Sequence, residues 1–186
     1  GVFTADPRII NSAKLIDEIT YDEMLEMSSS GAGVLMARSV EFGRRYNVPI
    51  IVKSTFTNNK GTVVKEKTME EAIVSGVTHN DKEVKFTLFG VPDQPGIAGT
   101  VFGSLSEIGT NVDMIVQNVS KESITDISFT APSEQQKDVE DALKNISKQL
   151  DAKGYDVDEN IARISIIGAG MKSESGVASK MFKTLG

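Results

Sequence analysis

Residues 84–98 read Val-Lys-Phe-Thr-Leu-Phe-Gly-Val-Pro-Asp-Gln-Pro-Gly-Ile-Ala, and this stretch decides the fold. Its first part, Val84 to Phe89, is rich in β-branched and aromatic residues and predicts a strand. Its end begins a helix over residues 95–108, because apolar residues recur there at helical spacing. The stripe consists of Ile97, Val101, Phe102, Leu105 and Ile108. A strand that leads through a short loop into an amphipathic helix indicates a compact α+β unit.

The following segments complete a recognisable order of elements. Residues 111–119 and 124–130 predict two strands joined by a polar turn, and residues 161–167 predict a closing strand. Ser133 and Gln136 have the spacing of a capping box at the start of a second helix. Its apolar stripe is Val139, Ala142, Leu143, Ile146 and Leu150. The order β-α-β-β-α-β predicts a ferredoxin-like unit, in which two helices cover one face of a four-stranded antiparallel sheet.

The residues before this unit have a different pattern. Thr20 and Glu23 have capping-box spacing and predict a short helix through about Met27. A second helix is expected from Val34 to about Tyr46. A short buried strand at residues 49–52 and a return strand at residues 62–64 follow it, around an Asn-Asn-Lys-Gly turn. The polar segment from Lys65 to Glu71 has no period, so we place a domain boundary there.

The strand and helix start of the first unit recur near the end of the chain. Lys85–Gly90 matches Arg163–Gly168, and Gly96-Ile97-Ala98 matches Gly176-Val177-Ala178. Phe182 and Leu185 stand at the offsets of Phe102 and Leu105. Because the second copy stops at Gly186, we expect a second unit that is incomplete, and a chain that is a piece of a longer polypeptide.

Composition excludes several classes of site and partner. The 186 residues include no Cys and a single His, so thiolate metal sites, a serine triad and multi-histidine metal sites are excluded. The 20 Lys and Arg residues against 26 Asp and Glu give a net charge of −6 without a basic block. Nucleic acid and anionic membranes are therefore not expected as partners. The absence of a signal-peptide pattern makes the cytoplasm the expected compartment.

The loop from Asp93 to Ala98 is the first candidate binding site. Pro95 suits the first turn of a helix, and Gly96 lets another group approach the backbone. The amides of Gly96, Ile97 and Ala98, with the positive end of the helix dipole, favour a carboxylate such as that of a free amino acid. In the alternative interpretation Asp93 is only the helix N-cap and the amides face water.

Polar residues in the next predicted strand extend this candidate. Because alternate residues of a strand share a face, Asn111, Asp113 and Gln117 would point one way and could recognise an ammonium group. The alternative is a simple solvent face. His79 precedes a turn and is expected to be an exposed residue at a strand end. The methionines at positions 24, 27 and 36 are expected in the core, and Arg8 could contact a nucleotide phosphate.

Five segments, in order along the whole chain, resemble the aspartate kinase family: Ile19–Met27, Gly31–Leu35, Phe86–Ala98, Asn111–Ser120 and Gly168–Met171. The resemblance implies an α/β remnant of the amino-acid-kinase domain at residues 1–66, followed by a regulatory region at residues 69–186. That region would hold ferredoxin-like (βαββαβ) ACT domains in tandem, the first at about 83–160 and the second begun at about 161–186. In some relatives a separate smaller subunit starts at an internal Met, and Met69 stands at the matching position.

The family reaction implied is the ATP-dependent phosphorylation of the β-carboxylate of L-aspartate, with Mg, in lysine, threonine and methionine biosynthesis. The family's Lys-x-Gly-Gly-Thr-Ser phosphate segment does not occur here, so we expect an inactive fragment with no catalytic residue, no metal ligand and no cofactor of its own. Where many relatives carry a Lys near the nucleotide, this chain has Gly33. The nucleotide contacts that the resemblance implies are Val2, Phe3, Thr4, Ala5, Asp6, Pro7 and Arg8.

The regulatory part resembles enzymes inhibited by L-lysine, or by L-lysine and L-threonine, whose effector sits between the ACT units of a homodimer. The dimer can also include a longer catalytic subunit. The loop 171–176 lacks the Asp-x-Pro-Gly order, which implies a different occupant or an empty second site. The alternative function is an ACT-type dimerisation module that binds no effector. The implied effector contacts are Asp93, Gln94, Pro95, Gly96, Ile97, Ala98, Asn111, Val112, Asp113, Gln117, Val177 and Ala178.

Overall fold

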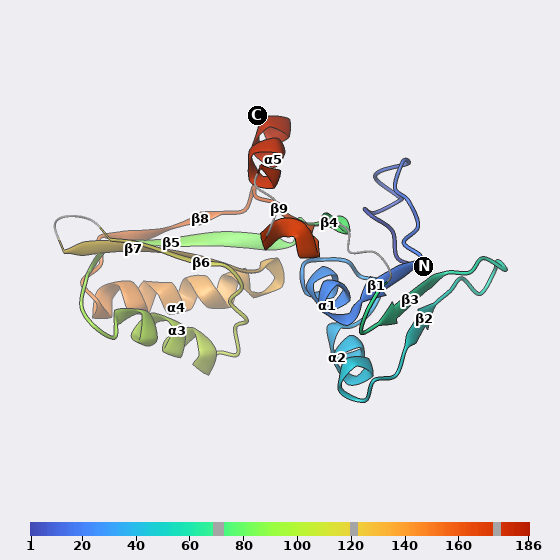
Figure 1. The fold of residues 1–186 in the computed structure, drawn as a ribbon. Coiled ribbons are helices and arrows are strands. Elements are labelled where there is room, and N and C mark those ends of the chain that lie inside the picture. The colour runs from blue at the N-terminus through green and yellow to red at the C-terminus, as the bar shows by residue number, and fades with distance from the viewer. Residues whose placement is uncertain (69–72, 120–122, 173–175) are drawn as a thin grey trace. The chain divides into compact units, whose positions relative to one another are not determined.

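The computed structural model describes residues 1–68, 73–119, 123–172 and 176–186 (Figure 1). Its contacts divide the chain into two compact units. One comprises Gly1–Asn80 with Ile164–Gly186, and the other comprises Asp81–Arg163. These units are groups of contacting residues, so the family boundary expected between residues 66 and 69 stays a prediction. Met69 lies outside the described residues. Among the described residues, no helix is long and apolar enough to cross a membrane.

The unit Asp81–Arg163 has the predicted ferredoxin-like order. Its four-stranded sheet has the order β6-β7-β5-β8, and each neighbouring pair is antiparallel. Both helices lie on the same face of this sheet (Figure 1). The elements are β5 (Glu83–Pro92), α3 (Ile97–Glu107), β6 (Ile115–Val119), β7 (Ile124–Pro132), the 3₁₀ turn η1 (Ser133–Gln135), α4 (Gln136–Gln149) and β8 (Gly154–Asp158).

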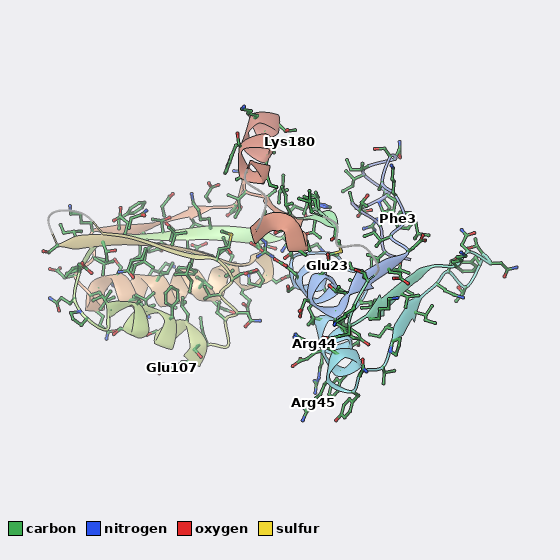
Figure 2. The ribbon with its side chains drawn as sticks, in the orientation of Figure 1. Phe3, Glu23, Arg44, Arg45, Glu107 and Lys180 are labelled. Atoms are coloured by element: carbon green, nitrogen blue, oxygen red, sulfur yellow. The ribbon has the colours of Figure 1, made fainter. Side chains whose placement is uncertain are left out.

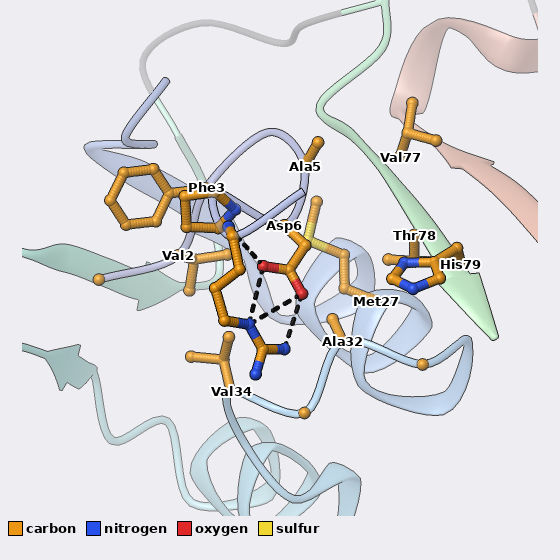
Figure 3. Close-up of a pocket in the computed structure, with 15 residues that line it drawn as sticks. Val2, Phe3, Ala5, Asp6, Met27, Ala32, Val34, Val77, Thr78 and His79 are labelled. Carbon is orange, nitrogen blue, oxygen red and sulfur yellow. Dashed lines mark hydrogen bonds and ion pairs between the residues drawn. The ribbon is translucent and has the colours of Figure 1, made fainter. Parts of the chain in front are cut away.

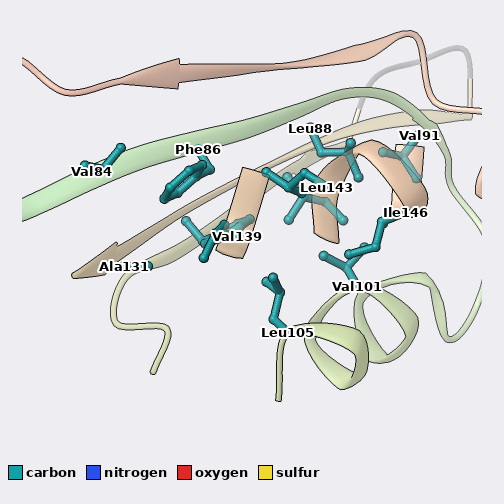
Figure 4. Packing of buried hydrophobic residues seen from close by; sticks show 12 residues of the cluster. Val84, Phe86, Leu88, Val91, Val101, Leu105, Ala131, Val139, Leu143 and Ile146 are labelled. Carbon is teal, nitrogen blue, oxygen red and sulfur yellow. The ribbon is translucent and has the colours of Figure 1, made fainter. Parts of the chain in front are cut away.

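The core of this unit lies between the sheet and the two helices (Figure 4). The ring of Phe86 on β5 stacks on that of Phe129 on β7, with 5.3 Å between centroids, and Phe102 meets Phe129 edge-on at 5.7 Å. Such pairs contribute about 0.5–1.5 kcal/mol beyond the burial of their area. From α4, Leu143 and its neighbours Val139 and Ile146 are buried on the predicted stripe.

Three boundaries in this unit differ from the prediction. The strand that closes the sheet is β8, whereas the predicted closing segment 161–167 forms a strand of another sheet. The capping box expected at Ser133 is not formed, because that residue begins the 3₁₀ turn and α4 has no side-chain cap. Residues 111–114 are irregular, so β6 begins only at Ile115.

The other unit begins with a small sheet of order β1-β3-β2, which packs against two helices. Its elements are β1 (Glu18–Thr20), α1 (Tyr21–Ser29), α2 (Ala37–Arg45), β2 (Ile50–Val52) and β3 (Thr62–Lys65). The capping box at the start of α1 is confirmed. The Glu23 amide donates to the Thr20 hydroxyl at 3.2 Å, and the Thr20 amide donates to the Glu23 carboxylate at 3.0 Å. Figure 2 labels Glu23 in the first turn of α1.

The second predicted helix and one predicted core methionine need correction. Val34 and Leu35 precede α2, which begins at Ala37 after an extended Met36. Met24 and Met27 are buried as predicted, but Met36 is 73% exposed because it lies outside the helix.

A two-stranded sheet that the sequence patterns do not predict joins distant parts of this unit. It pairs β4 (Gly76–Asn80) with β9 (Arg163–Ile167). Just before β4, the Ser75 amide donates to the Ile167 carbonyl at 2.7 Å. After β9 the chain continues into the 3₁₀ turn η2 (Ala169–Lys172) and α5 (Val177–Leu185). Segments from both ends of the chain therefore meet at β4.

Candidate functional site

A cavity of about 340 Å³ opens in the unit that contains Gly1–Asn80, beside the residues expected to contact a nucleotide (Figure 3). Its wall includes Val2, Phe3, Ala5, Asp6, Pro7 and Arg8, which are six of the seven expected residues. The seventh, Thr4, does not line the cavity. Its hydroxyl accepts from the Lys14 amide at 3.0 Å, and its carbonyl accepts from the Val77 amide at 2.8 Å. Thr4 therefore supports the segment that lines the cavity.

The charged residues of this cavity form one bidentate pair (Figure 3). Arg8 Nη2 lies 2.7 Å from Asp6 Oδ2, and Arg8 Nε donates to Asp6 Oδ1 at 3.0 Å. This side-chain hydrogen bond lowers the pKa of Asp6 from 3.8 to about 2, helped by the Arg8 amide, which donates to the same carboxylate at 2.9 Å. The pKa of Arg8 is raised by the same contact. The pair is thus fixed in its ionised form above strongly acidic pH.

A glycine loop between α1 and α2 forms the opposite wall. Gly31 has φ +111°, and a Cβ there would lie 2.5 Å from the carbonyl oxygen of His79. Only Gly combines that backbone conformation with so close an approach. A Cβ at Gly33 would meet nothing within 4 Å. The loop can therefore approach a ligand with its backbone.

Sequence patterns missed part of this cavity. Met27 of α1 and Val77, Thr78 and His79 of β4 also line it. His79 is an exposed strand residue, as predicted. Its place in the cavity depends on the pairing of β4 with distant segments, which local sequence patterns do not show.

An open groove of about 570 Å³ lies beside the start of α3, in the unit Asp81–Arg163. Its lining residues are Asp93 to Gly99 and Gln117. The structure thus brings the predicted loop 93–98 together with Gln117, although they are separate in the sequence. Among the described residues, the Asp93 carboxylate has no hydrogen-bond or ion-pair partner.

The backbone of this loop corrects the predicted helix start. Gly96, not Asp93, is the N-cap of α3, with φ +91°, and no side chain caps the helix. Pro95 lies in the turn before it. The Ile97 amide is used in this turn and donates to the Gln94 carbonyl at 3.2 Å. The first-turn amides of Ala98 and Gly99 have no partner within a helix and remain able to bind an anion.

Asn111, Val112 and Asp113 do not line the groove. The Asp113 carboxylate pairs with the guanidinium of Arg163, which also contacts the carboxylate of Glu83 at 2.9 Å. Val112 packs against the core of the sheet and helices. Because Asn111 and Asp113 precede β6, the strand alternation that placed them beside Gln117 does not apply.

The second copy of the repeat reproduces the helix start of the first. Gly176 is the N-cap of α5 with φ +106° and ψ −10°, whereas Gly96 has φ +91° and ψ −6°. Thr100 and Lys180 then donate their amides to the carbonyls of these two glycines at 3.0 and 2.9 Å. Val177 and Ala178 thus stand at the same positions of a helix as Ile97 and Ala98. Residues 173–175 of the loop before α5 lie outside the described residues.

Two family models match the chain. The amino acid kinase family matches residues 1–54, and the ACT domain matches residues 85–151. An aspartate kinase of Pseudomonas fluorescens is 45% identical over 188 residues, which cover all of this chain and 46% of that protein. The chain thus spans about half the length of such curated relatives.

Solved structures show the same likeness. The regulatory subunit of aspartate kinase from Thermus thermophilus is 34% identical with a TM-score of 0.58, over 61% of this chain and 75% of that one. Two structures of aspartokinase III of E. coli match this chain over its whole length, and the match covers about two fifths of that enzyme. In complex with aspartate and ADP it is 26% identical with a TM-score of 0.84, and with lysine and aspartate 25% identical with a TM-score of 0.75.

Proposed function

The chain belongs to the aspartate kinase family, and from this we propose that it is the feedback-regulated portion of an enzyme that phosphorylates L-aspartate with ATP. An end-product amino acid, L-lysine and/or L-threonine, binds its ACT region and inhibits the reaction. The structure of E. coli aspartokinase III with lysine supports this class of effector. Inhibition requires that the effector bind one arrangement of the protein more tightly than another, by about 1–3 kcal/mol.

The observation that carries this proposal is the set of polar groups around the groove at residues 93–99. The first-turn amides of Ala98 and Gly99, at the positive end of α3, suit the α-carboxylate of an amino acid. The carboxylate of Asp93 and the side-chain oxygen of Gln117 suit its ammonium group. The lining of the groove thus offers groups that suit both charges of a zwitterion.

The other expected effector residues take different parts in this proposal. Asp113 reaches an effector only by leaving Arg163, so we assign it to the ion pair and not to the groove. Val177 and Ala178 begin the second repeat and stay proposed residues of an equivalent site. A homodimer through the ACT domains, or a pairing with a longer catalytic subunit, would complete both sites.

We assign the cavity beside the segment 2–8 as the proposed nucleotide site of the kinase part. It combines apolar walls from Val2, Phe3 and Val34 with the Asp6–Arg8 pair and the backbone of the glycine loop. Apolar walls suit a base, and the charged pair with exposed amides suits ribose and phosphate oxygens. Among the described residues, no three or more His, Cys, Asp or Glu side chains are grouped so that they could hold a metal ion, so we assign no Mg²⁺ ligand to them.

Thermal unfolding of the chain with L-lysine, L-threonine or both tests the effector proposal. A ligand at about 100 times its dissociation constant adds about 2.7 kcal/mol, which raises the midpoint by roughly 5–10 °C in a protein of this size. D-lysine, with the same charges, is the control ligand. Asp93→Asn should abolish the shift, because it removes the charge beside the ammonium group and keeps the side-chain volume.

The second candidate function is an ACT-type assembly module that binds no effector. The edge strand β6 favours this function. Three apolar side chains at or next to its start are about half exposed: Met114, Ile115 and Val116. Such an edge can pair with a second copy. A stable dimer in light scattering, with no thermal shift from any amino acid, would favour this module over the effector proposal.

A further inference from the structure

Strand β4 forms one side of the cavity next to Asp6 and Arg8, and nothing in the proposed function uses it. Val77, Thr78 and His79 of this strand line the cavity. Figure 3 shows the imidazole of His79 on the β4 side, with Met27 drawn between it and Asp6. The strand therefore contributes side chains to a site otherwise made by the N-terminal segment and the glycine loop.

The backbone of β4 is held closely against both of these segments. The Val77 amide donates to the Thr4 carbonyl at 2.8 Å. A Cβ on Gly76 would lie 2.2 Å from Met27 Cε and 3.2 Å from the Thr4 carbonyl oxygen. The His79 carbonyl occupies the space beside Gly31. These contacts hold the backbone of β4 against the cavity, so the exposed His79 side chain extends from a fixed strand and not from a loop.

Among the polar side chains that line the cavity, His79 is available to bind a ligand. Asp6 and Arg8 satisfy one another through their bidentate contact. The other polar side chains in the wall are those of Thr78 and His79. The Thr78 hydroxyl is buried and has no hydrogen-bond partner among the described residues. A neutral imidazole offers one donor and one acceptor, and a protonated one offers two donors.

We propose that His79 is a further nucleotide-contacting residue, whose imidazole hydrogen-bonds an adenine nucleotide in the cavity beside Asp6. This inference rests on the proposed nucleotide site and adds to it a residue from the strand that leads toward the regulatory part. Base, ribose and phosphate atoms all accept hydrogen bonds, so adenosine, AMP and ADP are compared as ligands to find which part of the nucleotide His79 contacts.

The chain has a single histidine, which makes the test direct. One Hε1 resonance reports on His79 in a ¹H–¹³C spectrum. Titration with ADP at constant pH should shift this resonance along a saturating curve, with the same dissociation constant as the methyl resonances of Val2 and Val34. His79→Ala should weaken ADP binding about fivefold to tenfold, as expected for one lost hydrogen bond. His79→Gln, which keeps a donor and an acceptor, should restore part of the affinity.

Each outcome decides between two claims. If ADP shifts the Val2 and Val34 resonances but not that of His79, and His79→Ala binds like the unmodified chain, the role of His79 is refuted while the nucleotide site stands. If ADP shifts none of these resonances, the nucleotide site itself is refuted, and the inference falls with it. An equal loss of affinity in the Ala and Gln variants would reduce His79 to a packing role.

Discussion

Replacing Gly96 by Ala tests whether the left-handed cap of α3 is required. Gly96 has φ +91°, and a side chain there pays about 1–2 kcal/mol for a left-handed backbone, although its Cβ would meet nothing within 4 Å. The cost is therefore conformational and not steric. Gly103, in the exposed interior of the same helix, also has nothing within 4 Å of its Cβ. Gly103→Ala should stabilise the protein by about 1 kcal/mol, because Gly is a poor helix former.

The two variants add the same methyl group to one helix, so they form a matched pair. Urea unfolding followed by circular dichroism should separate their free energies of unfolding by about 2–3 kcal/mol, with Gly96→Ala the less stable. Gly96→Ala should also reduce the thermal shift from the effector, since it disturbs the amides that bind the carboxylate. If Gly96→Ala is as stable as Gly103→Ala, the left-handed cap is not the conformation of this loop and the groove argument fails.

Other changes test the remaining arguments. Leu105→Ala should cost about 2–5 kcal/mol in urea unfolding because Leu105 is fully buried, whereas Leu185→Ala at the equivalent position of the repeat, 58% exposed, should change stability by less than about 0.5 kcal/mol. The Asp6 carboxyl should titrate near pH 2 in ¹³C NMR, since its pKa is lowered from 3.8. Its ion pair is therefore fully present above pH 3.8 and lost as the pH falls through about 2, and Arg8→Ala should return the pKa toward 3.8. A value near 2 in that variant would contradict the assigned cause. Thr20→Ala should destabilise the protein by about 1 kcal/mol through loss of the α1 cap, and an unchanged urea midpoint would show that the capping box contributes nothing.

The elements predicted correctly are those with a strong local period. Helix α4 has an apolar, buried face and a polar face along its fourteen residues, so the spacing of its apolar residues predicts the helix directly. In contrast, β8 reads Gly-Tyr-Asp-Val-Asp, and only Tyr155 and Val157 pack on the core, because alternate side chains of a strand point to opposite faces and the helices cover one face. Its acidic residues resemble a loop, which is why residues 161–167 were predicted to close the sheet.

The candidate sites were predictable where their residues are close in the sequence. The cavity segment and the groove loop are each continuous, and resemblance or turn chemistry locates them. The role of Asp113 was not predictable, because its partner Arg163 is 50 residues away. The same holds for β4, whose five residues have no strong hydrophobic period and whose contacts come from both ends of the chain.

Strand β4 and the residue just before it are bonded to two segments that are far apart in the sequence. The Val77 amide donates to the carbonyl of Thr4, which supports the segment that lines the cavity, while the Ser75 amide, two residues earlier, donates to the carbonyl of Ile167 at the end of β9. Residues Gly168 and Gly170 pack so closely on Ile73 that neither has room for a methyl group. A local opening that exposes one of these amides to hydrogen exchange must strain the other. We therefore expect β4, beside the cavity, and the end of β9, which leads toward α5, to open as one cooperative unit.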